Sequence, residues 1–230
     1  MTDLLTDDEL SFCEYRKVKV TRPGDADYPK IFEGEEFRPH VLFYWGHPVW
    51  NTHDCLSVVG SRDPSHQALD WLEEELRLYL KKRVVAVVSG GARGVDIRAH
   101  QLAIRTSRPT VAFLPSGLMH LYPSSLEEWI DPIVAGGGAI ISQFSPSARM
   151  CKGFFHARNR LIAAISKTTL VIEARRQSGT AMTARYAQNL NRNVAVVPSF
   201  PTEAGLAGLD ILYEAGGQMI RDHLDLDVFT

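Results

Sequence analysis

A glycine-rich stretch between an apolar run and a helix-like run has residue types that suit anion binding. It spans Ser89–Asp96 and includes Ser89, Gly90, Gly91, Arg93 and Gly94. Glycine lacks a Cβ atom, so the backbone can turn tightly there and a ligand can come close. The N–H groups that open the following helix favour negative charge. The stretch could therefore bind phosphate, although a tight turn without a ligand explains one such stretch equally well.

Two other apolar runs, Leu56–Val59 and Thr169–Ile172, also end in small or cationic residues. The residues that follow them include Gly60, Ser61, Arg62, Arg175, Arg176, Ser178, Gly179 and Thr180. If the strands are parallel, all three turns lie at the sheet edge where open α/β sheets bind their ligands. A row of N–H and guanidinium groups at that edge would suit several phosphates better than one.

Basic residues surround an aromatic pair in residues 152–160. The basic residues are Lys152, Arg158 and Arg160, and the rings are Phe154 and Phe155. Proteins bind single-stranded nucleic acid in this way, because the cations follow the phosphates and the rings stack on bases. Phe155 lies three residues from both Lys152 and Arg158, which favours Phe155 as the presented ring and Phe154 as the buried one. Packing of the rings in the core is the alternative.

The formal net charge of −2 is unevenly distributed. Residues 132–202 contain nine basic residues and one acidic residue, Glu173, so this segment carries +8 and the rest of the chain −10. A basic segment in an otherwise acidic protein indicates a polyanionic partner. A basic face that is merely solvated is the weaker explanation, because these residues fall among the turns described above.

Short apolar runs alternate with helix-like segments along the chain. Strands are expected at residues 55–59, 84–88, 110–114, 139–141, 169–172 and 194–197. Helices are expected at residues 65–82, 95–105, 124–134 and 180–189, and after residue 160. This alternation implies right-handed βαβ crossovers. The fold class is therefore α/β, with a doubly wound, mostly parallel sheet and helices on both faces.

Composition indicates a globular protein. Hydrophobic residues make up 45% of the 230 residues and charged residues 23%. There is no apolar run of membrane-spanning length and the N-terminus is acidic, so we expect a cytoplasmic protein without a membrane partner. The three cysteines lack metal-ligand spacing, so we expect no metal site. Residues 1–50 should form an extension packed on a main domain of residues 51–230.

The ordered motifs resemble the DprA/Smf family of bacterial DNA-processing proteins over roughly residues 40–220. The motifs are Gly60-Ser61-Arg62, Ser89–Asp96 with Ala99-His100, Gly117 with Tyr122-Pro123, Phe155 with Arg158–Ile162, Glu173 with Ser178-Gly179 and Thr183-Ala184, and Val194–Pro198. Each motif alone is weak, whereas the ordered set is specific. The resemblance implies an extended Rossmann fold that binds single-stranded DNA without a nucleotide cofactor.

The resemblance also implies roles for individual residues and for partners. Arg62, Lys152, Arg158 and Arg160 would contact phosphates, Phe155 would stack on a base, Asn159 would hydrogen-bond DNA, residues 89–96 would bind phosphate through N–H groups, and Ser178, Gly179 and Thr180 would complete the floor. The protein would be a non-catalytic homodimer that helps to load a RecA-type recombinase in natural transformation. The C-terminal winged helix of many members is not expected in this chain.

An enzyme or sensor for a small nucleotide, from the lysine-decarboxylase-like Rossmann group, is the alternative function. That group usually carries a Pro-Gly-Gly-x-Gly-Thr turn, whereas this chain has Ala174–Thr180 in its place. Glu173 could serve as a base, although a carboxylate paired with a neighbouring arginine explains it better. Asp96 and His100 lie four residues apart and could form a catalytic pair, although Asp96 more simply favours the helix dipole. A pure interaction scaffold would leave the arginines unexplained.

Overall fold

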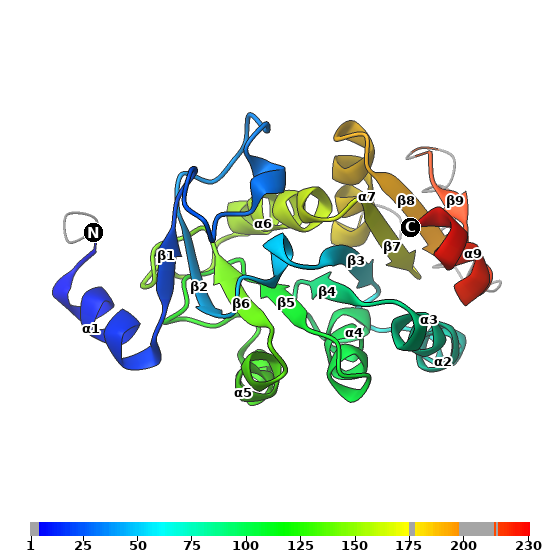
Figure 1. Cartoon of the computed structure of the whole chain (residues 1–230), viewed down its shortest axis with the longest axis horizontal. Helices are drawn as coiled ribbons and strands as arrows, with labels where there is room; N and C mark the ends of the chain where they lie inside the picture. Colours follow the sequence, from blue (N-terminus) through cyan, green and yellow to red (C-terminus); the bar gives the residue numbers. More distant parts are fainter. Residues whose placement is uncertain (1–4, 175–177, 198–213, 215) are drawn as a thin grey trace.

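Strands and helices alternate along most of the chain (Figure 1). The computed structural model describes residues 5–174, 178–197, 214 and 216–230. The strands are β1 (Lys19–Thr21), β2 (Leu42–Gly46), β3 (Asp54–Gly60), β4 (Val85–Ser89), β5 (Thr110–Phe113), β6 (Ala139–Ser142), β7 (Thr168–Ile172), β8 (Asn193–Val197) and β9 (Gln218–Met219). The α-helices are α1 (Asp7–Arg16), α2 (His66–Trp71), α3 (Arg77–Lys82), α4 (Val95–Arg105), α5 (Glu127–Ala135), α6 (Lys152–Ile165), α7 (Gly179–Asn189) and α9 (His223–Phe229).

Short helical turns complete the described elements. The 3₁₀ turns are η2 (Lys30–Phe32), η3 (Val49–Asn51) and η5 (Ser124–Leu126). A π-helical turn, η4 (Leu72–Leu76), joins α2 and α3 into one continuous helical segment. None of the helices in the described ranges is long and apolar enough to cross a membrane.

The described strands form one sheet in the order β1-β2-β6-β5-β4-β3-β7-β8-β9. Pairing is parallel from β6 through to β9, and antiparallel where β1 meets β2 and where β2 meets β6. Helices cover both faces, with α6 and α7 on one side and α2, α3, α4 and α5 on the other (Figure 1). The expected fold, a doubly wound and mostly parallel α/β sheet, is confirmed.

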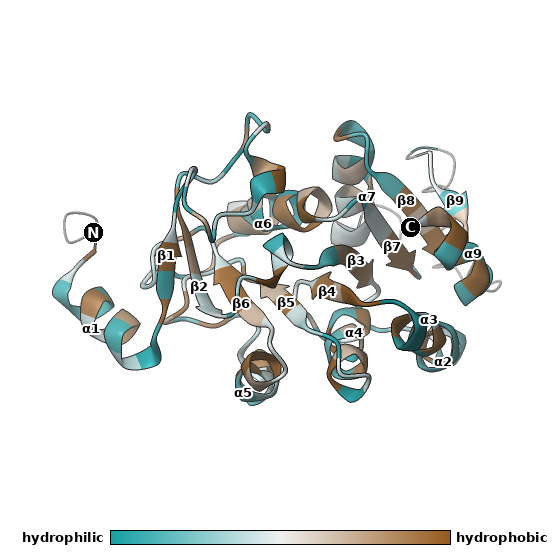
Figure 2. Cartoon of the chain, viewed as in Figure 1, coloured by the Kyte–Doolittle hydropathy of each residue, from teal (hydrophilic) through white to brown (hydrophobic). Residues whose placement is uncertain are grey.

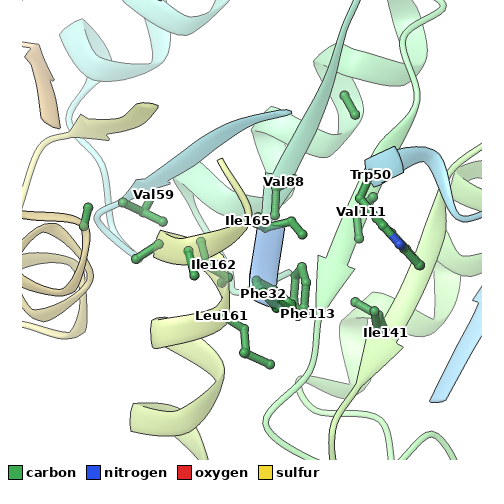
Figure 3. Close-up of a cluster of buried hydrophobic side chains, with 14 of the residues drawn as sticks. Phe32, Trp50, Val59, Val88, Val111, Phe113, Ile141, Leu161, Ile162 and Ile165 are labelled. Atoms are coloured by element: carbon green, nitrogen blue, oxygen red, sulfur yellow. The ribbon is translucent and has the colours of Figure 1, made fainter. Parts of the chain in front are cut away.

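Apolar residues of both helical layers pack against the sheet. In Figure 2 the brown colour of hydrophobic residues is prominent on the central strands, such as β4. On one face, Leu161, Ile162 and Ile165 of α6 pack against the strands, as Figure 3 shows. On the other face, the buried residues of α2, α3 and α4 form a second cluster with β3, β4 and β7. Burial of a central parallel sheet on both faces explains why its strands are continuous apolar runs in the sequence.

Helices α6 and α1 differ from the sequence prediction. The helix expected after residue 160 begins at Lys152, so the cations and rings of residues 152–160 lie on its first turns. Helix α1 is not predicted by the weak helical periodicity of the N-terminal region. A capping box stabilises it, because Thr6 and Glu9 each bind the other's backbone N–H.

The aromatic patch of residues 41–46 forms β2, and it adds to the sheet through β6. The Tyr44 ring is fully buried and meets Trp50 edge-on at a centroid distance of 5.3 Å. The Tyr28 hydroxyl, also buried, donates to the Pro39 carbonyl at 2.7 Å. These N-terminal aromatic residues are therefore part of the core on the α6 face.

The chain changes its direction across the sheet at β3. It runs from β3 through β4, β5 and β6 on one side, and then returns to β7 on the other side of β3. Loops that leave a sheet on either side of such a switch point diverge, and open α/β sheets bind ligands in the crevice between them. The fold therefore places the predicted site at the carboxyl ends of β3, β4 and β7.

Candidate nucleic-acid interface

A cleft of about 640 Å³ opens at this switch point. Its walls come from the loop after β3, the start of α4, the first turns of α6 and the start of α7. The polar and aromatic residues that line it are Ser61, Arg62, Asp63, Arg93, Asp96, Lys152, Phe155, His156, Arg158, Asn159, Ser178, Thr180 and Thr183. Three strand ends that are far apart in the sequence thus contribute to one site, as the sequence predicts.

The ring of Phe155 lies between two guanidinium groups. The guanidinium carbon of Arg62 is 5.9 Å from the ring centroid, and that of Arg158 is 5.8 Å away. Tyr122 meets the same ring edge-on at 5.5 Å. Lys152, three residues before Phe155 on α6, is exposed and also lines the cleft. An aromatic ring flanked by cations can stack on a base while the cations bind the neighbouring phosphates.

Arg158 is a buried cation, with only 6% of its surface exposed. Its Nε atom has no hydrogen-bond partner among the described residues. Burial raises the pKa of Asp96 and lowers the pKa of Arg158, while the charge of each opposes the shift of the other. Arg158 nevertheless lines the cleft, and the positive charge of its guanidinium suits a phosphate oxygen.

Backbone N–H groups of the glycine-rich turn bind a side chain of the protein itself. Asp96 Oδ2 accepts hydrogen bonds from the N–H groups of Gly90 at 3.2 Å and Ala92 at 3.3 Å. The Ser89 hydroxyl donates to the carbonyl of Val58 at 2.7 Å, inside the core. In this structure the Gly90 and Ala92 N–H groups, which were expected to bind phosphate, therefore bind Asp96 instead, and Ser89 does not line the cleft.

Close packing explains two glycines of the turn. A Cβ atom on Gly90 would lie 1.5 Å from Nη1 of Arg158. A Cβ atom on Gly94, where φ is +86°, would lie 2.3 Å from the carbonyl oxygen of Ser61. Glycine is required at both positions because protein atoms fill the space, so a ligand is not needed to account for either residue.

Asp96 and His100 do not form a pair. His100 is fully buried, and its Nδ1 lies 2.6 Å from Oγ1 of Thr110. The single hydroxyl hydrogen of Thr110 is donated to the Val87 carbonyl at 2.8 Å, so Nδ1 of His100 is the donor to Thr110. Burial, with the nearby charge of Arg158, lowers the pKa of His100 to about 3. The imidazole is therefore neutral near pH 7.

As the pH is lowered, the free energy of unfolding should fall more steeply in the wild type than in a His100→Asn variant. The folded state keeps His100 neutral from its ordinary pKa of 6.5 down to about 3, so only the unfolded state binds this proton in that range. One such proton lowers the free energy of unfolding by about 1.4 kcal/mol per pH unit. Urea denaturation between these pH values measures the difference, and equal slopes for the two proteins would show that the folded state binds the proton too.

Hydrogen bonds connect the loops on either side of the switch point. Thr180 Oγ1 donates to the Gly60 carbonyl at 2.9 Å. The Glu173 carboxylate accepts from the Ser65 N–H at 2.9 Å and from the Ser65 hydroxyl at 2.6 Å. Glu173 is buried and does not line the cleft. Ser65 is thus its partner among the described residues; Arg175 and Arg176, the neighbouring arginines with which the sequence would pair it, lie outside them.

The cleft brings together eleven of the residues that the sequence predicts for the site. They are Gly60, Ser61, Arg62, Arg93, Lys152, Phe155, Arg158, Asn159, Ser178, Gly179 and Thr180. Arg160, also predicted for the site, does not line the cleft; its guanidinium carbon lies 5.2 Å from the ring centroids of both Phe37 and Tyr186. Ser89, Gly90, Gly91 and Gly94 do not line the cleft either.

The two phenylalanines also differ from expectation. Both are half-buried, and the Phe154 ring stacks on Phe144 at a centroid distance of 3.7 Å. His156 and Met182 also line the cleft side by side, and neither was predicted from the sequence. A helix that starts at Lys152 places its third, fourth and seventh following residues on one face, so helical periodicity was the signal for His156.

The cations and the aromatic ring that line the cleft are the residue types that recognise a polyanion. Among the described residues, no group of three or more histidine, cysteine, aspartate or glutamate side chains could hold a metal ion. The family model for DNA recombination-mediator protein A matches residues 19–228. The chain belongs to this DprA/Smf family.

Other members of the DprA/Smf family match most of the chain. A putative DNA processing protein DprA from Mycobacterium tuberculosis is 36% identical over 236 residues, which cover 97% of this chain and 60% of that protein. The structure of DprA from Streptococcus pneumoniae gives a TM-score of 0.85 at 29% identity and covers 98% of this chain and 79% of the other. The chain spans between half and two thirds of the length of curated DprA/Smf relatives that it matches.

A second DprA structure matches the same fold. It is DNA processing protein A from Helicobacter pylori, described with its single-stranded DNA binding mode. The TM-score is 0.79 at 27% identity, and the match covers 93% of this chain and 98% of that chain. The extended Rossmann-like fold of the DprA/Smf family is thus shared over nearly the whole chain.

Proposed function

We propose that the cleft around Phe155 binds single-stranded DNA without reading its sequence. One observation carries the proposal: the Phe155 ring lies within 6 Å of the guanidinium groups of Arg62 and Arg158, in a cleft that Lys152 also lines. Rings stack on every base, and cations neutralise every phosphate, so the site should tolerate any sequence. The single-stranded DNA binding described for the Helicobacter pylori relative supports the same conclusion.

The proposed role is mediation of recombination rather than catalysis. The chain would act as a homodimer in the cytoplasm, with single-stranded DNA and a RecA-type recombinase as partners, in natural transformation. The description of the matching family as a recombination mediator supports this role. The position of Glu173, the candidate base, also supports it, because this carboxylate is buried, accepts both Ser65 hydrogen bonds at Oε2 and does not line the cleft.

Fluorescence anisotropy with a labelled thymidine oligonucleotide and a labelled duplex tests the proposal. We expect tighter binding of the single strand, with affinity that falls as salt rises because released counterions drive the association. A nucleoside monophosphate should not displace the oligonucleotide at comparable concentrations. Equal binding of both DNA forms, or stabilisation of the fold by the monophosphate alone, would contradict the proposal and favour a small-nucleotide site.

Replacing Arg62 or Lys152 with alanine should reduce the salt dependence of binding. Each residue is expected to neutralise one phosphate, and for single strands one phosphate contributes about 0.7 to the slope of log K against log salt. Arg160→Ala is the matched control, because Arg160 lies on the same helix as Lys152 but outside the cleft. Slopes that stay at the wild-type value in both cleft variants would rule out the phosphate contacts.

A further inference from the structure

Glu9 is a buried acid on an otherwise exposed first turn of α1. Only 3% of its surface is exposed, whereas Asp7 and Asp8 beside it are exposed. Its Oε2 accepts a hydrogen bond from the Thr6 N–H at 3.0 Å, which closes the capping box. A capping box satisfies the helix end at the surface and does not by itself require burial of the carboxylate.

The other oxygen of Glu9 binds a loop that is distant in the sequence. Its Oε1 accepts from the Ser145 hydroxyl at 2.8 Å, from the Ser147 N–H at 3.0 Å and from the Ser147 hydroxyl at 2.7 Å. Burial of a carboxylate is unfavourable unless hydrogen bonds replace its water. These bonds do so, and they fix α1 to the loop of residues 143–151.

This loop leads directly into the first turn of α6. Phe144 at its start stacks on Phe154 with an interplanar angle of 11°. Two backbone hydrogen bonds, from Gly117 N–H to the Ala148 carbonyl at 2.8 Å and from Met119 N–H to the Pro146 carbonyl at 2.9 Å, join it to a second segment. That second segment continues to Tyr122, whose ring meets Phe155. The positions of Phe154, which precedes Phe155 on α6, and of Tyr122, which meets the Phe155 ring, therefore both depend on this loop.

We propose that Glu9 is a positioning residue for the cleft: by holding the loop of residues 143–151, it fixes the first turn of α6 and the ring of Phe155. The proposal rests on the proposed DNA-binding function. Helix α1 lies at the end of the molecule beyond β1 (Figure 1), so Glu9 does not touch the DNA itself. It acts through Ser145 and Ser147.

The hydrogen bonds of Glu9 to Ser145 and Ser147 should persist at neutral pH. Burial alone would raise the pKa of Glu9, but hydrogen bonds from Ser147, Thr6 and Ser145 outweigh burial and lower the pKa to about 2. A carboxyl whose folded-state pKa is depressed contributes stability above its ordinary pKa, here 4.5, and loses it as the pH falls through about 2. Substitution is therefore the appropriate test.

Glu9→Ala is compared with Glu14→Ala, which removes the same charge from an exposed position of the same helix. Without DNA, hydrogen exchange should accelerate in residues 143–156 of Glu9→Ala but not of Glu14→Ala. With DNA, Glu9→Ala should bind the thymidine oligonucleotide about 3- to 10-fold more weakly, with an unchanged salt slope. Loss of a negative charge would by charge alone strengthen the binding of a polyanion, so the expected direction separates positioning from electrostatics.

Two further variants distinguish positioning from general destabilisation. Ser147→Ala leaves α1 intact and should shift exchange and affinity in the same direction by less. In a Phe155→Ala background, Glu9→Ala should weaken binding little further, because the ring it positions is absent. Unchanged exchange in residues 143–156, or additive losses in the double variant, would overturn the proposal. A wild-type chain that does not bind DNA would contradict the function instead, and the exchange result would still decide whether Glu9 holds the loop.

Discussion

Phe155→Ala should bind a thymidine oligonucleotide about 5- to 150-fold more weakly than the wild type. The ring is expected to stack on one base, and such stacking contributes about 1–3 kcal/mol per base. The salt slope should not change, because no phosphate contact is lost. Anisotropy titrations at two salt concentrations measure both quantities, and they separate the role of the ring from that of Arg62 and Arg158 beside it.

Phe155→Tyr provides the matched comparison, because it keeps an aromatic face and should bind within a few-fold of the wild type. The edge-on contact with Tyr122 should also survive in this variant. If the alanine variant binds as tightly as the wild type, Phe155 is not a stacking platform and the cleft must hold DNA through its cations alone.

The second large effect concerns stability. Arg158→Ala should lower the free energy of unfolding by about 1–3 kcal/mol, because removal of one of two neighbouring buried charges of opposite sign leaves the other without its counter-charge. Asp96 carries that other charge, and it is also buried. The space around Gly90 that the guanidinium fills would become empty in this variant. Urea denaturation followed by circular dichroism measures the loss.

Two variants control this prediction. Arg93→Ala removes an exposed arginine from the same cleft and should change the free energy of unfolding by no more than about 0.5 kcal/mol. Asp96→Asn, added to Arg158→Ala, should recover part of the loss, because it removes the uncompensated charge. An Arg158→Ala protein as stable as the wild type would mean that the two charges are not coupled.

The central sheet and the position of the cleft could be predicted from the sequence. Buried parallel strands are short apolar runs, and their carboxyl ends must share an edge, so the runs ending at Gly60, Ser89 and Ile172 indicated one site. The start of α6 was harder to predict because Gly153 follows Lys152 directly. A Cβ atom on Gly153 would meet nothing within 4 Å, so this glycine has no steric role, although glycine has a low helix propensity.

Side-chain direction could not be predicted, because it depends on contacts between distant segments. Arg160 was expected at a phosphate, but Phe37 from the N-terminal region and Tyr186 from α7 hold it outside the cleft. The glycine-rich turn has the composition of a phosphate site, yet two of its N–H groups donate hydrogen bonds to Asp96. Helix α1 did have a usable signal, since Thr6 and Glu9 have the spacing of a capping box.

Photo-cross-linking of a 4-thiothymidine oligonucleotide tests most directly whether DNA lies in the Phe155 cleft. Trypsin cleaves after Lys152 and Arg158, so the peptide Gly153–Arg158 carries Phe155 together with His156 and Arg158, which also line the cleft. If DNA lies in this cleft, we expect the peptide to carry the nucleotide adduct in the wild type and to lose it in Phe155→Ala. Adducts confined to peptides that do not line the cleft, with Gly153–Arg158 unmodified, would contradict it.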